Sequence, residues 1–130
     1  MKRLFYPAIF HPEDVGFSVQ VPDIDGCFTE GDTLDEAYIN SIEAIGINLE
    51  DISDPNNFPT PSNPTTITVP DGDFVALIEF DMLDYTRRHS KKSVKKTLTI
   101  PSWLNAEAEA QHINFSSVLQ AALKQQLGIQ

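Results

Sequence analysis

The stretch Val94-Lys95-Lys96-Thr97-Leu98-Thr99-Ile100-Pro101 decides the fold of the C-terminal part of this chain. One side of the stretch carries Val94, Lys96, Leu98 and Ile100, and the other side carries Lys95, Thr97 and Thr99. This alternation is typical of a strand with two different faces. Proline has no amide hydrogen to donate, so Pro101 ends the strand. The pattern therefore predicts a short strand over residues 94–101.

Two helices are predicted after this strand. Ser102 is a good N-cap for a short first helix, and Asn114 is a good N-cap for a second. Gly128 stands where a helix C-terminus favours glycine. The apolar stripe of the second helix comprises Phe115, Val118, Leu119, Ala122, Leu123 and Leu127. Residues 94–130 are thus expected to form a strand–helix–helix (βαα) module.

A module of this size cannot bury an adequate core alone, and its single strand leaves backbone groups unpaired. Both problems disappear if two copies pair their strands antiparallel about a two-fold axis. We therefore expect a homodimer with a ribbon-helix-helix arrangement, and the sequence leaves open whether dimers join into tetramers. A two-stranded ribbon fits the DNA major groove, where Lys and Thr side chains reach base edges.

The predicted DNA contacts fall into two groups. The outward face of the ribbon, with Lys95, Thr97 and Thr99, is expected to read bases. The start of the second helix is expected to hold a phosphate, as helix N-termini do. The remaining predicted DNA-binding residues are Lys92, Lys96, Asn114, Ser116 and Ser117.

The charge of −10 is distributed unevenly along the chain. Residues 1–86 contain 17 acidic and two basic side chains, whereas residues 87–130 contain seven basic and two acidic ones. Such a contrast indicates parts with different partners. We predict an acidic domain over residues 1–86, a basic linker over 87–93 and the DNA-binding module over 94–130.

The acidic domain is predicted to be α+β, with the order βββαβ. Strands are expected over residues 4–10, 17–21, 27–30 and 74–80. Thr33 and Glu36 form a capping box before a helix over 34–50, in which Gly46 costs about 1 kcal/mol and loosens the last turn. The residues predicted to face the sheet are Leu34, Tyr38, Ile42, Ile45 and Leu49.

Two further segments complete this domain. Residues 53–70 contain five prolines and are predicted to be an extended crossover pinned to the surface. Residues 81–88 are expected to form a short helical segment that leads out of the domain.

The chain resembles the HicB antitoxins over nearly its full length. The most specific pieces are Pro22-Asp23-Ile24-Asp25-Gly26-Cys27 and Asn114-Phe115-Ser116-Ser117. The resemblance is also carried by Tyr6-Pro7-Ala8, Gly16-Phe17-Ser18-Val19, Gly31-Asp32-Thr33-Leu34, Glu36-Ala37, Leu98-Thr99-Ile100-Pro101 and Val118-Leu119-Gln120.

This resemblance implies a partial ribonuclease-H-like N-terminal domain that binds and neutralises HicA, a small basic mRNA-cleaving toxin. It also implies a C-terminal domain that represses the toxin–antitoxin operon by binding operator DNA. The acidic charge of the N-terminal part agrees with a basic partner. The sequence does not indicate which N-terminal residues contact the toxin.

Two other functions remain open from the residues. One is a ribbon-helix-helix repressor whose N-terminal domain senses a small ligand. The other is a metal-dependent nuclease, which needs several carboxylates converging on Mg²⁺. The candidate carboxylates are Asp14, Asp23, Asp25, Glu30, Asp32 and Glu43. Asp23 and Asp25 are placed in a turn, where Asp shapes the backbone, and Asp32 lies beside a helix start, where it favours the helix dipole. No candidate lies inside an apolar strand core, as such sites usually require, so we expect no enzyme.

The remaining features argue against a disulfide, a metal site and a membrane span. Cys27, the one cysteine, cannot form an internal disulfide and is interpreted as a small buried apolar residue. The spacing of His11, His89 and His112 is not that of a metal pair, and we expect neither metal nor cofactor. No apolar run is long enough to cross a membrane, so a cytoplasmic protein is expected. Trp103 is expected to stay partly exposed.

Overall fold

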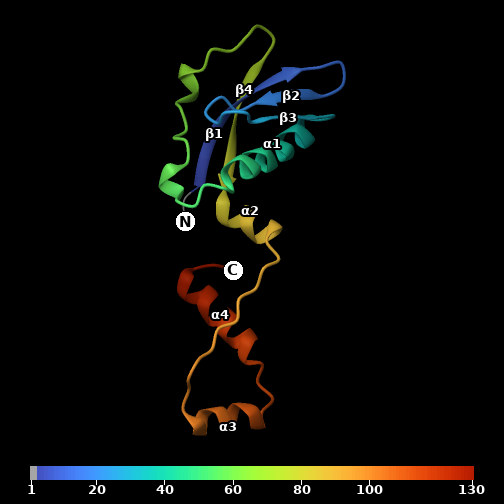
Figure 1. The fold of residues 1–130 in the computed structure, drawn as a ribbon. Coiled ribbons are helices and arrows are strands. Elements are labelled where there is room, and N and C mark those ends of the chain that lie inside the picture. The colour runs from blue at the N-terminus through green and yellow to red at the C-terminus, as the bar shows by residue number, and fades with distance from the viewer. Residues whose placement is uncertain (1–2) are drawn as a thin grey trace. The chain divides into compact units, whose positions relative to one another are not determined.

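The computed structural model describes residues 3–130, which form two compact units (Figure 1). Unit 1 extends to Lys91, and unit 2 spans Lys92–Gln130. Unit 1 contains a four-stranded sheet and the helices α1 and α2, whereas unit 2 contains α3 and α4. The α+β architecture expected from the sequence is confirmed.

The sheet of unit 1 is antiparallel throughout, with the strand order β3-β2-β1-β4. The strands are β1 (Arg3–Pro12), β2 (Phe17–Gln20), β3 (Phe28–Gly31) and β4 (Phe74–Asp81). The long central strand β1 pairs with β4 from Arg3↔Asp81 to Phe10↔Phe74. The predicted βββαβ order is therefore confirmed, and β4 occupies one edge of the sheet.

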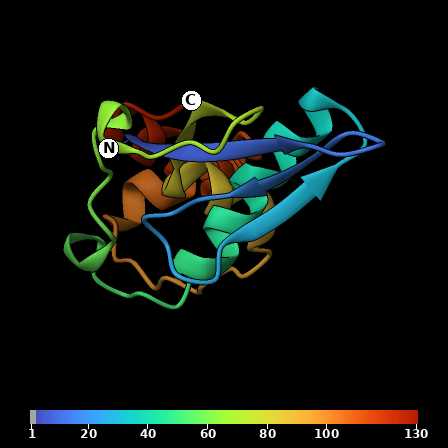
Figure 2. The ribbon, with the colours of Figure 1, turned by 90° about the horizontal axis from the view of Figure 1, so that it is seen from above.

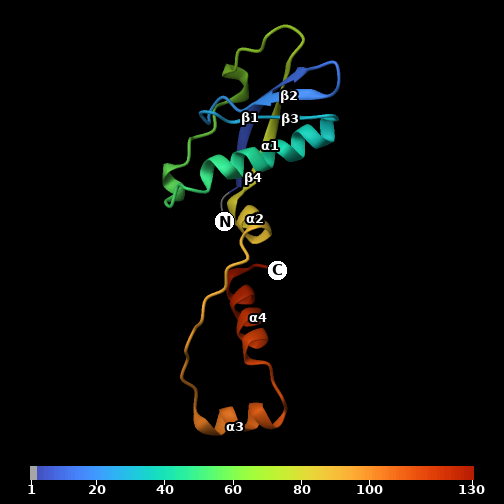
Figure 3. The same cartoon turned by 45° about the vertical axis from the view of Figure 1, so that its right-hand side comes forward.

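Helix α1 (Leu34–Leu49) packs on one face of this sheet (Figures 2 and 3). The Thr33 hydroxyl accepts the amide of Glu36 at 3.1 Å, so the predicted cap is present. The predicted inward stripe is partly wrong, because Leu34 is 47% exposed. The residues of α1 that are buried are Ala37, Ser41, Ile45, Gly46 and Leu49. Small side chains on this stripe let the helix approach the sheet closely, which leaves Tyr38 and Ile42 at its margin.

Gly46 does not loosen the end of α1, contrary to the prediction. The helix continues to Leu49, and Gly46 is the position where Tyr85 of α2 (Met82–His89) packs against it. A Cβ atom on residue 46 would lie 2.1 Å from Cε1 of Tyr85, which is far inside van der Waals contact. The absence of a side chain at this position is therefore what allows α2 to dock on α1.

The proline-rich crossover is held to the surface of unit 1, as predicted. It contains two short 3₁₀ turns, Pro55–Asn57 and Pro64–Thr66. The Tyr6 hydroxyl donates to the carbonyl of Pro59 at 2.6 Å, and the amide of Ser62 donates to Asp23 Oδ2 at 2.7 Å. Burial, together with the nearby Asp23 charge, raises the pKa of Tyr6 to about 12. Tyr6 thus remains a hydrogen-bond donor at neutral pH.

The core of unit 1 lies between the sheet, α1 and α2. Its largest fully buried side chains include Tyr6, Phe10, Phe80, Ile45 and Leu49. Cys27 is also buried, as predicted, and burial raises the pKa of its thiol to about 11. The thiol is therefore protonated and packs as an apolar group.

Unit 2 consists of α3 (Ser102–Ala110) and α4 (Phe115–Leu127) after an irregular segment. The strand predicted over residues 94–101 is not formed in the single chain. A strand is assigned by its pairing with another strand, and residues 94–101 pair with no strand of the described chain. The predicted cap at Ser102 is wrong, because α3 begins at Ser102 itself and is preceded by Pro101.

The expected ends of α4 are confirmed. Asn114 Oδ1 accepts the amide of Ser117 at 3.1 Å, and Gly128 adopts a left-handed conformation with φ of +70°. The short helical segment expected over residues 81–88 is present as α2, and Arg87, Arg88 and His89 form its last turn. A side chain from the sequence-distant α1 holds this turn in place, as described below.

Candidate functional site

The predicted DNA-binding residues lie in two segments of unit 2. The irregular segment carries five of them, all exposed: Lys92, Lys95, Lys96, Thr97 and Thr99. Asn114, Ser116 and Ser117 lie at the start of α4 and are exposed as well. The lysines and threonines are thus on the surface, where contact with another macromolecule is sterically possible.

The start of α4 is already partly engaged by its own side chains. The amide of Ser117 donates to Asn114 Oδ1, and the Ser116 hydroxyl accepts Nε2 of Gln120 at 2.9 Å. The Ser117 amide is therefore used by the cap and is not available to a phosphate in this conformation.

The apolar side chains of unit 2 have no core of their own. No residue from Lys92 to Gln130 is buried, and neither α3 nor α4 contains a buried position. Val94 is 88% exposed, and Trp103 and Leu127 are 67% and 68% exposed. The other exposed large apolar residues of unit 2 are Leu98, Ile100, Leu104, Ile113, Phe115, Val118 and Leu123. An apolar surface this extensive on so few residues is typical of half an interface.

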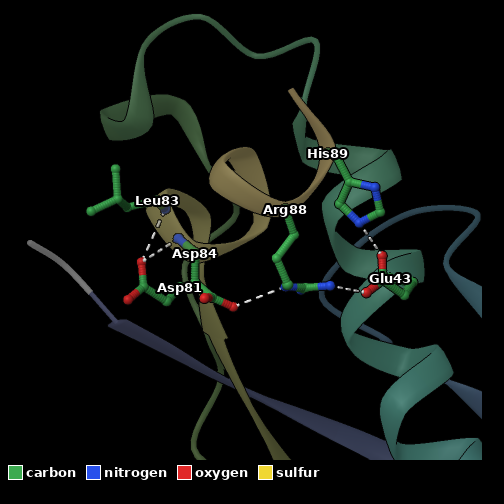
Figure 4. A network of polar contacts seen from close by, with 6 residues as sticks. All are labelled: Glu43, Asp81, Leu83, Asp84, Arg88 and His89. Atoms are coloured by element: carbon green, nitrogen blue, oxygen red, sulfur yellow. Dashed lines mark hydrogen bonds and ion pairs between the residues drawn. The ribbon is translucent and has the colours of Figure 1, made fainter. Parts of the chain in front are cut away.

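A polar network joins α1 to α2 in unit 1 (Figure 4). Arg88 lies between two carboxylates: Nη1 is 2.6 Å from Glu43 Oε1, and Nε is 3.1 Å from Asp84 Oδ2. Glu43 Oε2 also lies 2.6 Å from Nε2 of His89. Partial burial opposes ionisation of Glu43, but the hydrogen bonds with Arg88 and His89 outweigh it and lower its pKa. The network therefore fixes the last turn of α2, and sequence analysis missed it.

The carboxylates considered for a metal site do not gather in one place. Asp23 binds the backbone and hydroxyl of Ser62, and Glu43 is engaged by Arg88 and His89. Asp14 and Asp25 lie in loops, Glu30 lies in β3, and Asp32 directly precedes the cap of α1. Within residues 3–130, no three His, Cys, Asp or Glu side chains are grouped as metal ligands.

None of the helices in residues 3–130 is both long and apolar enough to span a membrane. The molecule is defined instead by two dissimilar parts: a folded acidic α+β unit, and a helical unit with a basic leading segment and an uncovered apolar surface.

The chain belongs to the family of HicB-like antitoxins of bacterial toxin–antitoxin systems, whose family model matches residues 6–123. The resemblance inferred from the sequence is thereby confirmed.

The chain is also similar to individual proteins. The chain is 33% identical over 105 residues to an uncharacterised 14.9 kDa protein from the rep–hol intergenic region of Haemophilus phage HP1 (strain HP1c1), covering 78% of this chain and 76% of the relative. It is also similar to a chain of a toxin–antitoxin complex from Streptococcus pneumoniae, with a TM-score of 0.60 and 25% identity over 96% of this chain and 99% of that one. The fold is shared with the Burkholderia pseudomallei antitoxin HicB, with a TM-score of 0.50 and 24% identity over 96% and 97% of the two chains.

Proposed function

We propose that this antitoxin neutralises a HicA-type toxin, a small basic ribonuclease, through unit 1 and represses its own operon through unit 2. Membership in the HicB-like family supports a toxin partner, as does the similarity to a chain of a toxin–antitoxin complex. The acidic residues of unit 1 favour association with a basic protein, since complementary charge accelerates encounter. A partial ribonuclease-H-like origin of unit 1 stays a prediction of the family resemblance.

The observation that carries the proposal for unit 2 is the exposure of most of its large apolar side chains, together with the absence of any buried residue. A second copy of the chain would cover them, and its residues 94–101 would supply the missing partner strand. The resulting ribbon would expose Lys95, Thr97 and Thr99 of both chains on one face. Such a ribbon suits the major groove, where these side chains act as base readers.

The test is a titration of the chain into its own upstream DNA at several salt concentrations, with fluorescence anisotropy as the readout. Affinity should fall steeply with salt, since lysines on phosphates displace counterions. Lys95→Ala should weaken binding, and Lys124→Ala is the matched control because it removes the same charge from the far end of α4. Equal effects of the two variants, or no specific binding at low salt, would contradict DNA recognition by the ribbon.

Neutralisation of the toxin should be separable from operator binding. Thr97→Ala combined with Thr99→Ala should reduce operator affinity roughly 10- to 100-fold, since base contacts contribute about 1–3 kcal/mol. The same variant should inhibit RNA cleavage by the toxin as well as the wild-type chain does. Parallel loss of both activities would contradict the assignment of one function to each unit.

A further inference from the structure

The free edge of β4 presents backbone groups to solvent. β4 pairs with β1 on one side, and no other strand of the described chain lies on the other side. The amide of Glu79 donates to the Tyr38 hydroxyl at 3.4 Å, so it points away from β1. Because amides alternate sides along an antiparallel strand, the amides of Val75 and Leu77 point the same way. An eight-residue strand with such an open edge can accept a further strand.

A groove lies beside this edge, between β4 and α1, and is here called the β4 groove. It consists of two adjoining hollows of about 520 and 470 Å³ that share Tyr38 and Ile39. Its apolar lining comprises Leu34, Tyr38, Ile39 and Ile42 of α1 with Phe10 of β1 and Phe74 and Ala76 of β4. Ile39 is 58% exposed, so this apolar side chain of α1 lies in the groove and not in the core. The groove therefore offers apolar contacts next to backbone hydrogen-bonding groups.

The charge of the β4 groove is predominantly negative. Five carboxylates line it: Asp35, Glu43, Glu79, Asp81 and Asp84. The two guanidinium groups of the lining are already paired, Arg3 with Glu79 at 3.0 Å and Arg88 with Glu43 and Asp84 (Figure 4). This excess of negative charge favours a basic occupant over an acidic one.

We infer that the β4 groove binds the toxin, by taking an extended segment with alternating apolar and basic side chains as a fifth strand on β4. This inference rests on the proposed function and adds the surface at which it acts. The incoming carbonyl would replace the Tyr38 hydroxyl at the Glu79 amide, and side chains on one face of the new strand would meet Ile39 and Leu34. A second copy of this chain is a poor occupant, because pairing two β4 edges would bring like-charged carboxylates together.

Two variants of the full-length chain test the inference. Ile39→Arg places a cation in the β4 groove. Ile47→Arg makes the same change at a position on α1 that is equally exposed, at 60%, and does not line the groove. The probe is a purified HicA-type toxin, and the readout is its dissociation constant by calorimetry. Ile39→Arg should weaken binding at least tenfold, and Ile47→Arg by less than twofold.

Hydrogen exchange supplies a second, mutation-free readout. Addition of the toxin should protect the amides of Val75 and Leu77, since they would donate to the new strand. Equal affinities of the two variants, or unchanged exchange in β4 while the toxin is bound, would overturn the inference and leave the proposed function intact. Failure of the wild-type chain to bind the toxin would overturn both. A changed mass of the toxin-free Ile39→Arg oligomer would assign the groove to a second copy and also overturn the inference.

Discussion

The two units differ in how far a single chain buries their apolar side chains. Unit 1 closes a core around Tyr6, Phe10 and Phe80, whereas unit 2 buries no residue at all in the single chain. Both contain similar kinds of apolar side chain, so composition does not explain the difference. Unit 1 has a sheet long enough to accept a helix on one face, and unit 2 has one unpaired strand-forming segment. The contrast teaches that unit 1 buries its core within one chain, and it supports the proposal that unit 2 completes its core with a second copy.

The largest expected effect comes from disrupting the apolar face of the segment before α3. Leu98→Asp should lower dimer affinity at least 100-fold and abolish operator binding, because a charge would replace an apolar side chain at the proposed ribbon interface. Sedimentation measures the dimer, and the fluorescence of Trp103, the one tryptophan, reports on unit 2. Unfolding of unit 1 should be unchanged.

Val15→Asp is the control for this substitution. Val15 lies in the turn between β1 and β2 and is 69% exposed, so the variant adds the same charge to the surface of unit 1. Its dimer affinity should match that of the wild-type chain. A monomeric wild-type chain with a stable unit 2 would contradict the contrast between the units.

A smaller effect is expected from filling the contact between α1 and α2. Gly46→Ala gains about 1 kcal/mol of helix propensity, but overlap with Tyr85 costs about 1–3 kcal/mol. We expect a net loss in the free energy of unfolding of unit 1, measured by urea denaturation with circular dichroism. In a Tyr85→Ala background the same substitution should become neutral or stabilising. Stabilisation in the wild-type background would show that α2 does not need this close approach.

The smallest effect concerns a pair in unit 1 formed by the exposed His11 and the largely buried carboxylate of Asp73. His11 Nδ1 lies 2.6 Å from Asp73 Oδ1, and this hydrogen bond, with the Asp73 charge, raises the pKa of His11 above its ordinary value of 6.5. Folding therefore favours the protonated imidazole. The resulting stabilisation is complete below the unfolded pKa and is lost as the pH rises through the folded pKa. Titration of His11 by NMR should show the raised pKa, and Asp73→Asn should return it toward 6.5; an unchanged titration in that variant would contradict the pairing.

Local signals in the sequence predicted much of this fold. Thr33 and Asn114 were identified as caps because the side-chain oxygen of an N-cap residue accepts the amide three residues later in the sequence. Both hydrogen bonds are present. Strand order could not be predicted in this way. The pairing of β1 with β4 joins residues that are more than sixty positions apart, and nothing in either strand specifies which edge the other will occupy.

Sequence reasoning also missed the features that depend on contacts distant in the chain. The Glu43–Arg88 pair joins residues 45 positions apart, so no local pattern indicated that Arg88 has a partner on α1. Gly46 was interpreted from its helix propensity, which gives no information on tertiary contacts such as the packing of the Tyr85 ring on this residue. The strand predicted over residues 94–101 is absent from the single chain, because the pairing proposed for it is with a second copy.

The register of β1 with β4 also sets the order in which the activities of this protein can arise during synthesis. β1 is made first, yet its pairing is complete only when Asp81 reaches Arg3. A chain is made from its N-terminus and its domains fold as units, so the sheet can close while α3 and α4 are still to be translated. Under the proposed division of functions, each new molecule acquires its toxin-binding unit before it can dimerise and repress its own operon.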